Sequence, residues 1–248
     1  MSAVAPPRLL LGLRDATETH GIAAVCRARD LVATLGGRHS LELGIEVDRG
    51  AGEIERWALA ATLLGSRISP AVALRSYRAL EHAGIRTIAD ARCWGRDELV
   101  TLLDEGAHAR YDDLTASRLL ALAHAVSARF GGCLASAWDE CASSSELRAV
   151  LESLPGWGPV TVRTFMRELR GVWPVTDVPL DRRAVTAAHH LHLPDELTEL
   201  TSLAVAAHLD VRDLEAGLVR LALCHDLGRC PGGGECPFAG SDRNPRRF

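Results

Sequence analysis

A helical period of apolar residues runs through most of this chain and limits the folds that it can adopt. Apolar residues recur every three to four positions in ten segments, and this spacing gives a helix one buried face. Strand-like alternation is confined to a short run around Leu43 to Val47, and glycine or proline separates the segments. The sequence therefore predicts an all-α fold of short helices joined by tight turns. The predicted helices cover residues 22–35, 54–64, 71–83, 96–103, 116–130, 145–154, 160–169, 182–191, 194–208 and 211–224.

The composition is that of a globular protein. Of the 248 residues, 47% are hydrophobic and 24% are charged, which excludes a disordered or collagen-like chain. The longest uncharged apolar stretch near the start, Leu9 to Leu13, is far shorter than a membrane span or the core of a secretory signal. We therefore expect a cytoplasmic monomer with no membrane partner.

All 28 basic residues are arginine, and the chain contains no lysine and no glutamine. This excludes every mechanism that needs a lysine side chain, although a genome rich in G and C would produce the same bias. Asn244 is the only asparagine, so recognition of adenine by a side-chain amide is disfavoured. Because the net charge is −4, any surface for nucleic acid has to be a local patch of arginines.

Residues 154–161, with the sequence LPGWGPVT, form a glycine-rich turn directly before a predicted helix. A Gly-x-Gly turn at a helix start directs successive backbone N–H groups, aided by the helix dipole, at one point in space. That geometry suits a phosphate oxygen and needs no basic side chain. A plain connection between two helices, in which the glycines only permit the turn, is the alternative interpretation.

A second motif, TDVPLDR at residues 176–182, begins a new helix just under twenty residues after this turn, with Asp177 placed as its N-cap. The order L-P-G-x-G, helix and aspartate resembles the helix-hairpin-helix DNA glycosylases, the superfamily of endonuclease III. The resemblance covers roughly Glu53 to Leu193 and is most specific from Leu154 to Phe165. It implies two helical lobes with a cleft between them. Residues 53–176 would form a helical barrel that ends in the hairpin, and residues 1–52 with 177–248 would form the second lobe.

The resemblance assigns the catalytic carboxylate to Asp177. An aliphatic residue and an arginine follow it at the family's spacing, as Leu180 and Arg182. Asp181 is the alternative, because the loop before the aspartate varies in length among relatives. Breaking an N-glycosidic bond builds positive charge on the sugar, which a carboxylate can stabilise while it orients a water molecule.

The resemblance also assigns residues to DNA binding. The hairpin would hold a phosphate of the damaged strand, while wedge residues fill the gap left by the flipped base. Arg67 occupies the usual wedge position, and Arg110 and Tyr111 resemble a second intercalating loop; surface ion pairs and a half-buried tyrosine are the alternatives. The DNA-binding residues implied in this way are Arg67, Arg110, Tyr111, Gly156, Gly158, Val160 and Arg163.

Family members that also cut the DNA backbone carry a lysine two positions after the second hairpin glycine, where this chain has Val160. The resemblance therefore implies a monofunctional glycosylase acting on duplex DNA with a damaged or mismatched base, and needing no cofactor for the chemistry. A non-catalytic protein that binds distorted DNA through the same hairpin, with Asp177 as a helix cap only, is the alternative. The identity of the target base stays open.

Three cysteines near the C-terminus, Cys224, Cys230 and Cys236, are candidate metal ligands. Many relatives carry a [4Fe-4S] loop of four cysteines, but the spacing here differs and the fourth position falls on Asp242. The three thiolates with His225 or Asp242 could instead hold zinc. A loop that binds no metal is the remaining alternative.

Overall fold

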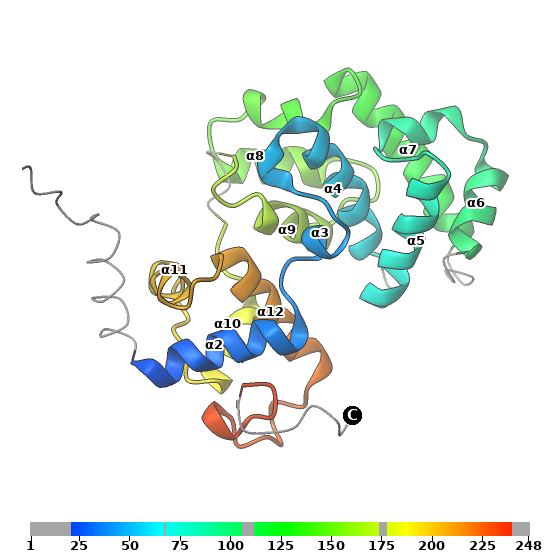
Figure 1. The fold of residues 1–248 in the computed structure, drawn as a ribbon. Helices are drawn as coiled ribbons and strands as arrows, with labels where there is room; N and C mark the ends of the chain where they lie inside the picture. The colour runs from blue at the N-terminus through cyan, green and yellow to red at the C-terminus, as the bar shows by residue number, and fades with distance from the viewer. Residues whose placement is uncertain (1–20, 67, 106–111, 174–177, 240–248) are drawn as a thin grey trace, which may run out of the picture. The chain divides into compact units, whose positions relative to one another are not determined.

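The computed structural model describes residues 21–66, 68–105, 112–173 and 178–239 (Figure 1). Within these residues the secondary structure is entirely helical, apart from one isolated bridge between Arg170 and Trp173. The predicted all-α class is therefore confirmed. No single helix in the described ranges has both the length and the apolar character needed to cross a bilayer. Two consecutive helices, α7 (Asp112–Phe130) and η3 (Leu134–Glu140), pass the same test together across a bend of 46°.

The chain divides into two compact units, each with its own apolar core. The larger unit spans Ser40–Val178, and the smaller one combines Met1–His39 with Pro179–Phe248. The predicted lobes were 53–176 and the remainder of the chain. The arrangement of the two units, and with it the predicted cleft, stays a prediction.

Helix α4 lies in the middle of the larger unit, where it contacts α5, α9, η1 and η3 (Figure 1). Most of its side chains are buried, including Trp57, Leu59 and Leu63, so nearly every face of this helix is covered. The elements of this unit are α3 (His39–Glu42), η1 (Val47–Arg49), α4 (Ala51–Leu64), α5 (Pro70–His82), η2 (Ala89–Cys93), α6 (Arg96–Glu105), α7 (Asp112–Phe130), η3 (Leu134–Glu140), α8 (Ser144–Glu152) and α9 (Pro159–Glu168).

The short alternating run from Leu43 to Val47 lies near the start of the larger unit and explains that boundary. Leu43, Ile45 and Val47 all point into its core, yet they pair with no other strand. The alternation therefore serves an irregular segment that buries every second side chain. Because these residues belong to that core, the larger unit starts at Ser40, the second residue of α3, and includes η1.

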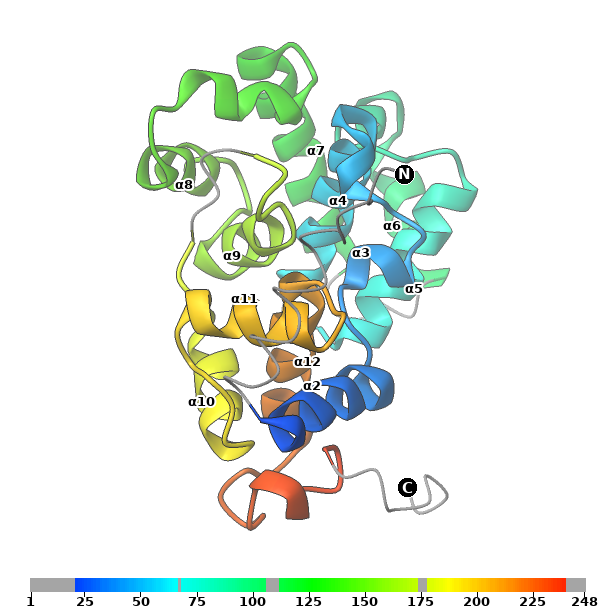
Figure 2. The same cartoon turned by 60° about the vertical axis from the view of Figure 1, so that its left-hand side comes forward.

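The smaller unit joins one helix from the start of the chain to three from its end. Helix α2 packs against α11 and α12, and α12 packs against α10, as both ribbon views show (Figures 1 and 2). Leu31, Leu203 and Leu218 are fully buried among these helices. The elements are α2 (Ile22–Leu35), α10 (Arg182–His190), α11 (Leu197–Ala206), α12 (Val211–Cys224) and η4 (Gly233–Glu235).

An ion pair fixes the segment after α2 to the start of α12. The Asp213 carboxylate accepts hydrogen bonds from the backbone N–H of Arg38 at 2.9 Å and from its Nε at 3.0 Å. Gly37 lies so close that a Cβ atom there would be 2.5 Å from Asp213 Oδ1. Arg38 is only 7% exposed, so its charge depends on this partner and on the more distant Asp210.

We predict that Asp213→Ala destabilises the protein by about 3 kcal/mol, because it leaves a buried guanidinium without its main partner. Glu46→Ala removes the exposed pair with Arg49 and should cost less than about 1 kcal/mol. Urea unfolding of both variants measures the difference. Equal effects would contradict the assigned role of the Arg38–Asp213 pair.

Candidate nucleic-acid interface and candidate metal centre

The predicted hairpin joins α8 to α9. Two large apolar side chains lie on its inner side, and its outer side carries glycines and a proline. Leu154 and Trp157 are buried, whereas Pro155, Gly156 and Gly158 are exposed. The Trp157 N–H donates to the Leu154 carbonyl at 3.1 Å and closes the turn. Gly156 has φ +80°, a conformation that favours glycine. The turn is thus held from within while its backbone faces outward.

Two tryptophans lock this hairpin onto α4. Trp157 Nε1–H donates to Thr62 Oγ1 at 2.9 Å, and Trp57 Nε1–H donates to the Phe165 carbonyl at 3.1 Å. The Trp157 ring also meets Phe165 edge-on, with the ring centroids 5.0 Å apart. Each of the two segments therefore supplies one indole donor to the other, which sets the position of the first turn of α9.

Beside the hairpin lies a groove of about 500 Å³. Its walls come from the end of α4, one face of α7, the hairpin and the first turn of α9. The first intrahelical bond of α9 runs from Val162 N–H to the Gly158 carbonyl at 3.1 Å, so the amides of Val160 and Thr161 have no acceptor inside the helix. The lining residues are Gly65, Ser66, Leu114, Thr115, Arg118, Gly156, Gly158, Pro159, Val160 and Thr161.

Arg118 brings a positive charge to this groove. It is exposed on α7, and its aliphatic carbons lie against Gly156, where a Cβ atom would be 3.6 Å from Arg118 Cβ. In the described part of the chain no hydrogen bond or ion pair engages its guanidinium. Arg118 was not among the residues predicted from the sequence. The residues around it on α7 do not indicate that it lies beside Gly156, which follows 38 positions later in the chain.

The structure brings together three of the predicted DNA-binding residues, Gly156, Gly158 and Val160, on the wall of this groove. Val160 is 52% exposed. Arg163 lies half-buried on α9 and does not line the groove. The remaining predicted site residues, Arg67, Arg110, Tyr111 and Asp177, lie outside the described residues.

Asp181, the alternative catalytic residue, caps α10. It is 6% exposed, and its Oδ1 accepts the Arg183 N–H at 2.8 Å. Its own backbone N–H donates to Glu215 Oε1 at 3.1 Å. The prediction that Asp177 caps this helix was therefore wrong. Residues 178–180, with a proline in the middle, are not helical, and Asp181 is the carboxylate directly before the first helical residue.

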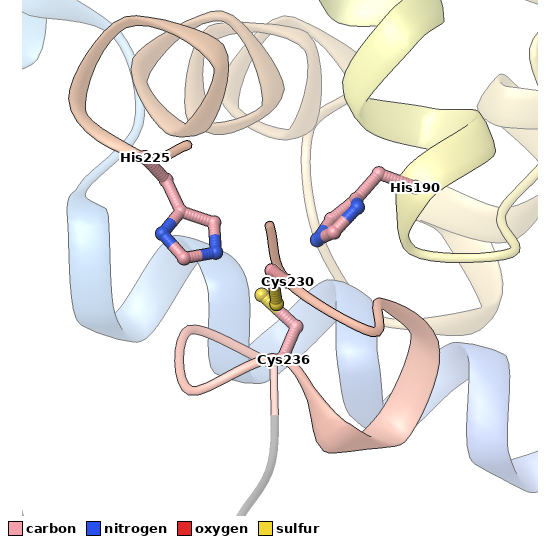
Figure 3. A group of neighbouring side chains, drawn as sticks. All are labelled: His190, His225, Cys230 and Cys236. Atoms are coloured by element: carbon pink, nitrogen blue, oxygen red, sulfur yellow. The ribbon is translucent and has the colours of Figure 1, made fainter. Parts of the chain in front are cut away.

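A second group of side chains could hold a metal ion. His190, His225, Cys230 and Cys236 each present one ligand atom, and these atoms lie within 4.8 Å of one another (Figure 3). His190 ends α10, His225 follows α12, and the two cysteines belong to the C-terminal segment. Cys236 is buried and the other three are half-buried.

This group differs from the predicted ligand set. Cys224 is not part of it, because it lies in the last turn of α12, where its side chain is exposed. The chain leaves the helix at the next residue, His225, whose extended backbone turns that side chain toward the cysteines. The sequence pattern did not indicate His190 as a candidate ligand. Asp242, the other alternative, lies outside the described residues.

Burial favours the uncharged forms of two side chains of this group, His190 and Cys236. It lowers the pKa of His190, as do the neighbouring His225 and His192. Burial also raises the pKa of Cys236 to about 11, with further contributions from the Cys230 and Cys224 thiols. A neutral imidazole is already in the form that binds a metal, whereas a thiol has to lose its proton on binding.

Comparison of the chain with protein-family models and with curated proteins finds no match.

We predict that Gly65→Ala destabilises the larger unit by about 1–3 kcal/mol, because a Cβ atom there would lie 1.9 Å from Thr161 Oγ1. Gly52→Ala, on the same helix, meets no atom within 4 Å and should be neutral or stabilising by up to about 1 kcal/mol. Urea unfolding compares the two. If both variants unfold alike, the close contact between α4 and α9 is not a constraint.

Proposed function

We propose that the protein is a monofunctional DNA glycosylase, which removes a damaged or mismatched base from duplex DNA by hydrolysing its N-glycosidic bond. It would act as a cytoplasmic monomer. The observation that carries the proposal is the groove at the hairpin, where backbone amides and the Arg118 side chain come together. Amides at a helix start with an adjacent guanidinium suit a phosphate of a DNA strand.

The backbone at Gly158 supports this interpretation. Its φ of −90° and ψ of 178° are accessible to any residue, and a Cβ atom there would meet nothing within 4 Å. The fold itself therefore does not require glycine at this position. A hairpin without a side chain here leaves the amides of α9 open to a ligand that approaches as closely as a phosphate does.

The catalytic carboxylate in this proposal is Asp177. Asp181, the other aspartate of the motif, caps α10 and is 6% exposed, which supports the choice of Asp177. In the proposed reaction the Asp177 carboxylate stabilises positive charge on the sugar and orients the attacking water. Arg67, Arg110 and Tyr111 would fill the space left by the flipped nucleotide.

The reaction would end at the abasic site. Because the chain has no lysine, no lysine side chain can form a Schiff base with the opened sugar. The position that carries this lysine in bifunctional relatives is Val160, an apolar residue on the groove wall. The DNA backbone should therefore stay intact until the abasic site is cleaved by another agent.

A non-catalytic protein that binds distorted DNA is the second candidate. The hairpin groove supports it equally well, because phosphate binding alone needs no carboxylate. The two candidates differ only in what Asp177 does.

We expect Arg118→Ala to weaken binding of duplex DNA and to lower the salt dependence of the affinity by about one unit in the log–log slope, because one phosphate contact is lost. Arg86→Ala is the matched control: this exposed arginine follows the far end of α5, away from the groove. Fluorescence anisotropy at several salt concentrations measures both. An unchanged slope for Arg118→Ala, or an equal loss for Arg86→Ala, would show that the groove does not bind the DNA backbone.

The decisive test is a panel of labelled duplexes with uracil, a T:G mismatch, an oxidised, an alkylated or an abasic site. We expect wild-type protein to give strand breaks on one substrate only after hot alkali, and Asp177→Asn to lower the rate by about 10²- to 10⁴-fold while it keeps its DNA affinity.

Absence of breaks on every lesion, with affinity for distorted duplexes retained, would select the binding protein. Strand breaks without alkali, from protein free of contaminating lyase, would contradict the monofunctional assignment. Circular dichroism of Asp177→Asn serves as the control for folding.

A further inference from the structure

The C-terminal segment returns to the ends of α10 and α12 and brings ligand atoms from both together. We propose that His190, His225, Cys230 and Cys236 bind one zinc ion in tetrahedral geometry, in the place where the resemblance implies an iron–sulfur cluster. This inference goes beyond the proposed glycosylase function and does not depend on it.

Two orphaned nitrogen atoms point to a ligand. Nε2 of His190 and Nε2 of His225 are both buried, and neither has a hydrogen-bond partner among the described residues. A buried polar atom without a partner costs free energy, so two of them in one small group call for an explanation. Figure 3 shows both rings beside the sulfur atoms of Cys230 and Cys236. One metal ion between them would satisfy both nitrogens.

The size of the group fits a single ion. Zinc–nitrogen bonds of about 2.0–2.1 Å and zinc–sulfur bonds of about 2.3 Å place the ligand atoms of a tetrahedral site about 3.3–3.8 Å apart. The four ligand atoms here lie within 4.8 Å of one another, so small side-chain rotations complete the tetrahedron.

The same residues do not fit a [4Fe-4S] cluster. A cube of iron and sulfide lies between its ligands and needs them further apart than a single ion does. Such clusters are typically held by four thiolates, whereas this group has two. Cys224, the first thiolate of the predicted loop, is exposed and outside the group.

The chemistry of the four ligands favours zinc. Two thiolates with two imidazoles form a common structural zinc set, and four protein ligands leave no coordination position for a substrate. Calcium and magnesium are disfavoured because they take oxygen ligands. The site is thus suited to a structural role.

The backbone of the C-terminal segment is shaped for close approach to α10. Gly232 and Gly233 have φ values of +79° and +54°. A Cβ atom at Gly232 would be 2.4 Å from the His190 carbonyl oxygen, and one at Gly233 would be 2.9 Å from His192 Nδ1. Phe238 covers His225 from another side, with ring centroids 5.0 Å apart. Zinc would hold this segment against the ends of the two helices.

The first test is metal analysis of the full-length protein, purified with its affinity tag removed and no chelator present. We expect one zinc per chain by mass spectrometry of the elements, no acid-labile sulfide and no visible absorption of an iron–sulfur cluster. Removing the metal with a chelator should lower Tm by at least about 5 °C. Iron with stoichiometric sulfide, or a metal-free protein that takes up no zinc on titration, would overturn the proposal.

Matched variants identify the ligands. Cys230→Ser and His190→Asn should lose the zinc, whereas Cys224→Ser and His192→Asn should keep one zinc per chain. His192 is a suitable control because it is exposed and has φ 52°, which asparagine tolerates. Loss of metal from Cys224→Ser, or its retention in His190→Asn, would reject this ligand set.

A third measurement covers the case in which ligand variants fail to fold. Replacing zinc by Co²⁺ in the wild-type protein should give the intense visible bands of tetrahedral cobalt, together with sulfur-to-cobalt charge transfer of two thiolates. A weak octahedral spectrum without charge transfer would contradict the proposal. Because none of these measurements uses base release, their outcome is independent of the glycosylase assay.

Discussion

The larger unit depends on the contact between the end of α4 and the start of α9. Trp57 and Trp157 donate their indole N–H groups across this contact, in opposite directions, and Gly65 allows the first turn of α9 to come within van der Waals distance. A buried indole donor without a partner would cost free energy, so the two bonds fix both the distance and the register of the helices. These two hydrogen bonds therefore also fix the position of the hairpin before α9.

This contact also bears on how a chain with net negative charge would present the proposed phosphate site. Leu154 and Trp157 anchor the hairpin, so the glycine backbone is left on its outer face, and the partial positive charge comes from amides and the helix dipole. Among the described residues that line the groove, Arg118 is the arginine. A local patch of this kind is unaffected by an overall charge of −4.

The smaller unit is held together by different means. It brings the start and the end of the chain together through the Arg38–Asp213 pair and a modest apolar core. Its last segment has few large apolar side chains to bury, and it approaches α10 through glycines. A zinc ion with four protein ligands would supply the stabilisation that this segment cannot obtain from hydrophobic packing.

The longer helices and the hairpin could be predicted from the sequence. The predicted bounds of α2 and α12 coincide with the observed ones, because apolar periodicity directly encodes the buried face of a helix. The lack of lysine likewise excludes Schiff-base chemistry by a lysine without any structure. Three features could be seen only once the chain is folded. Arg118 lies beside Gly156, and the His/Cys group contains His190 instead of Cys224. The cap of α10 is Asp181. The first two are contacts between distant segments, which depend on how helices pack, and local sequence patterns carry no record of that packing. The third depends on where the chain enters α10 after Pro179, and helix boundaries are the least precise part of a sequence pattern.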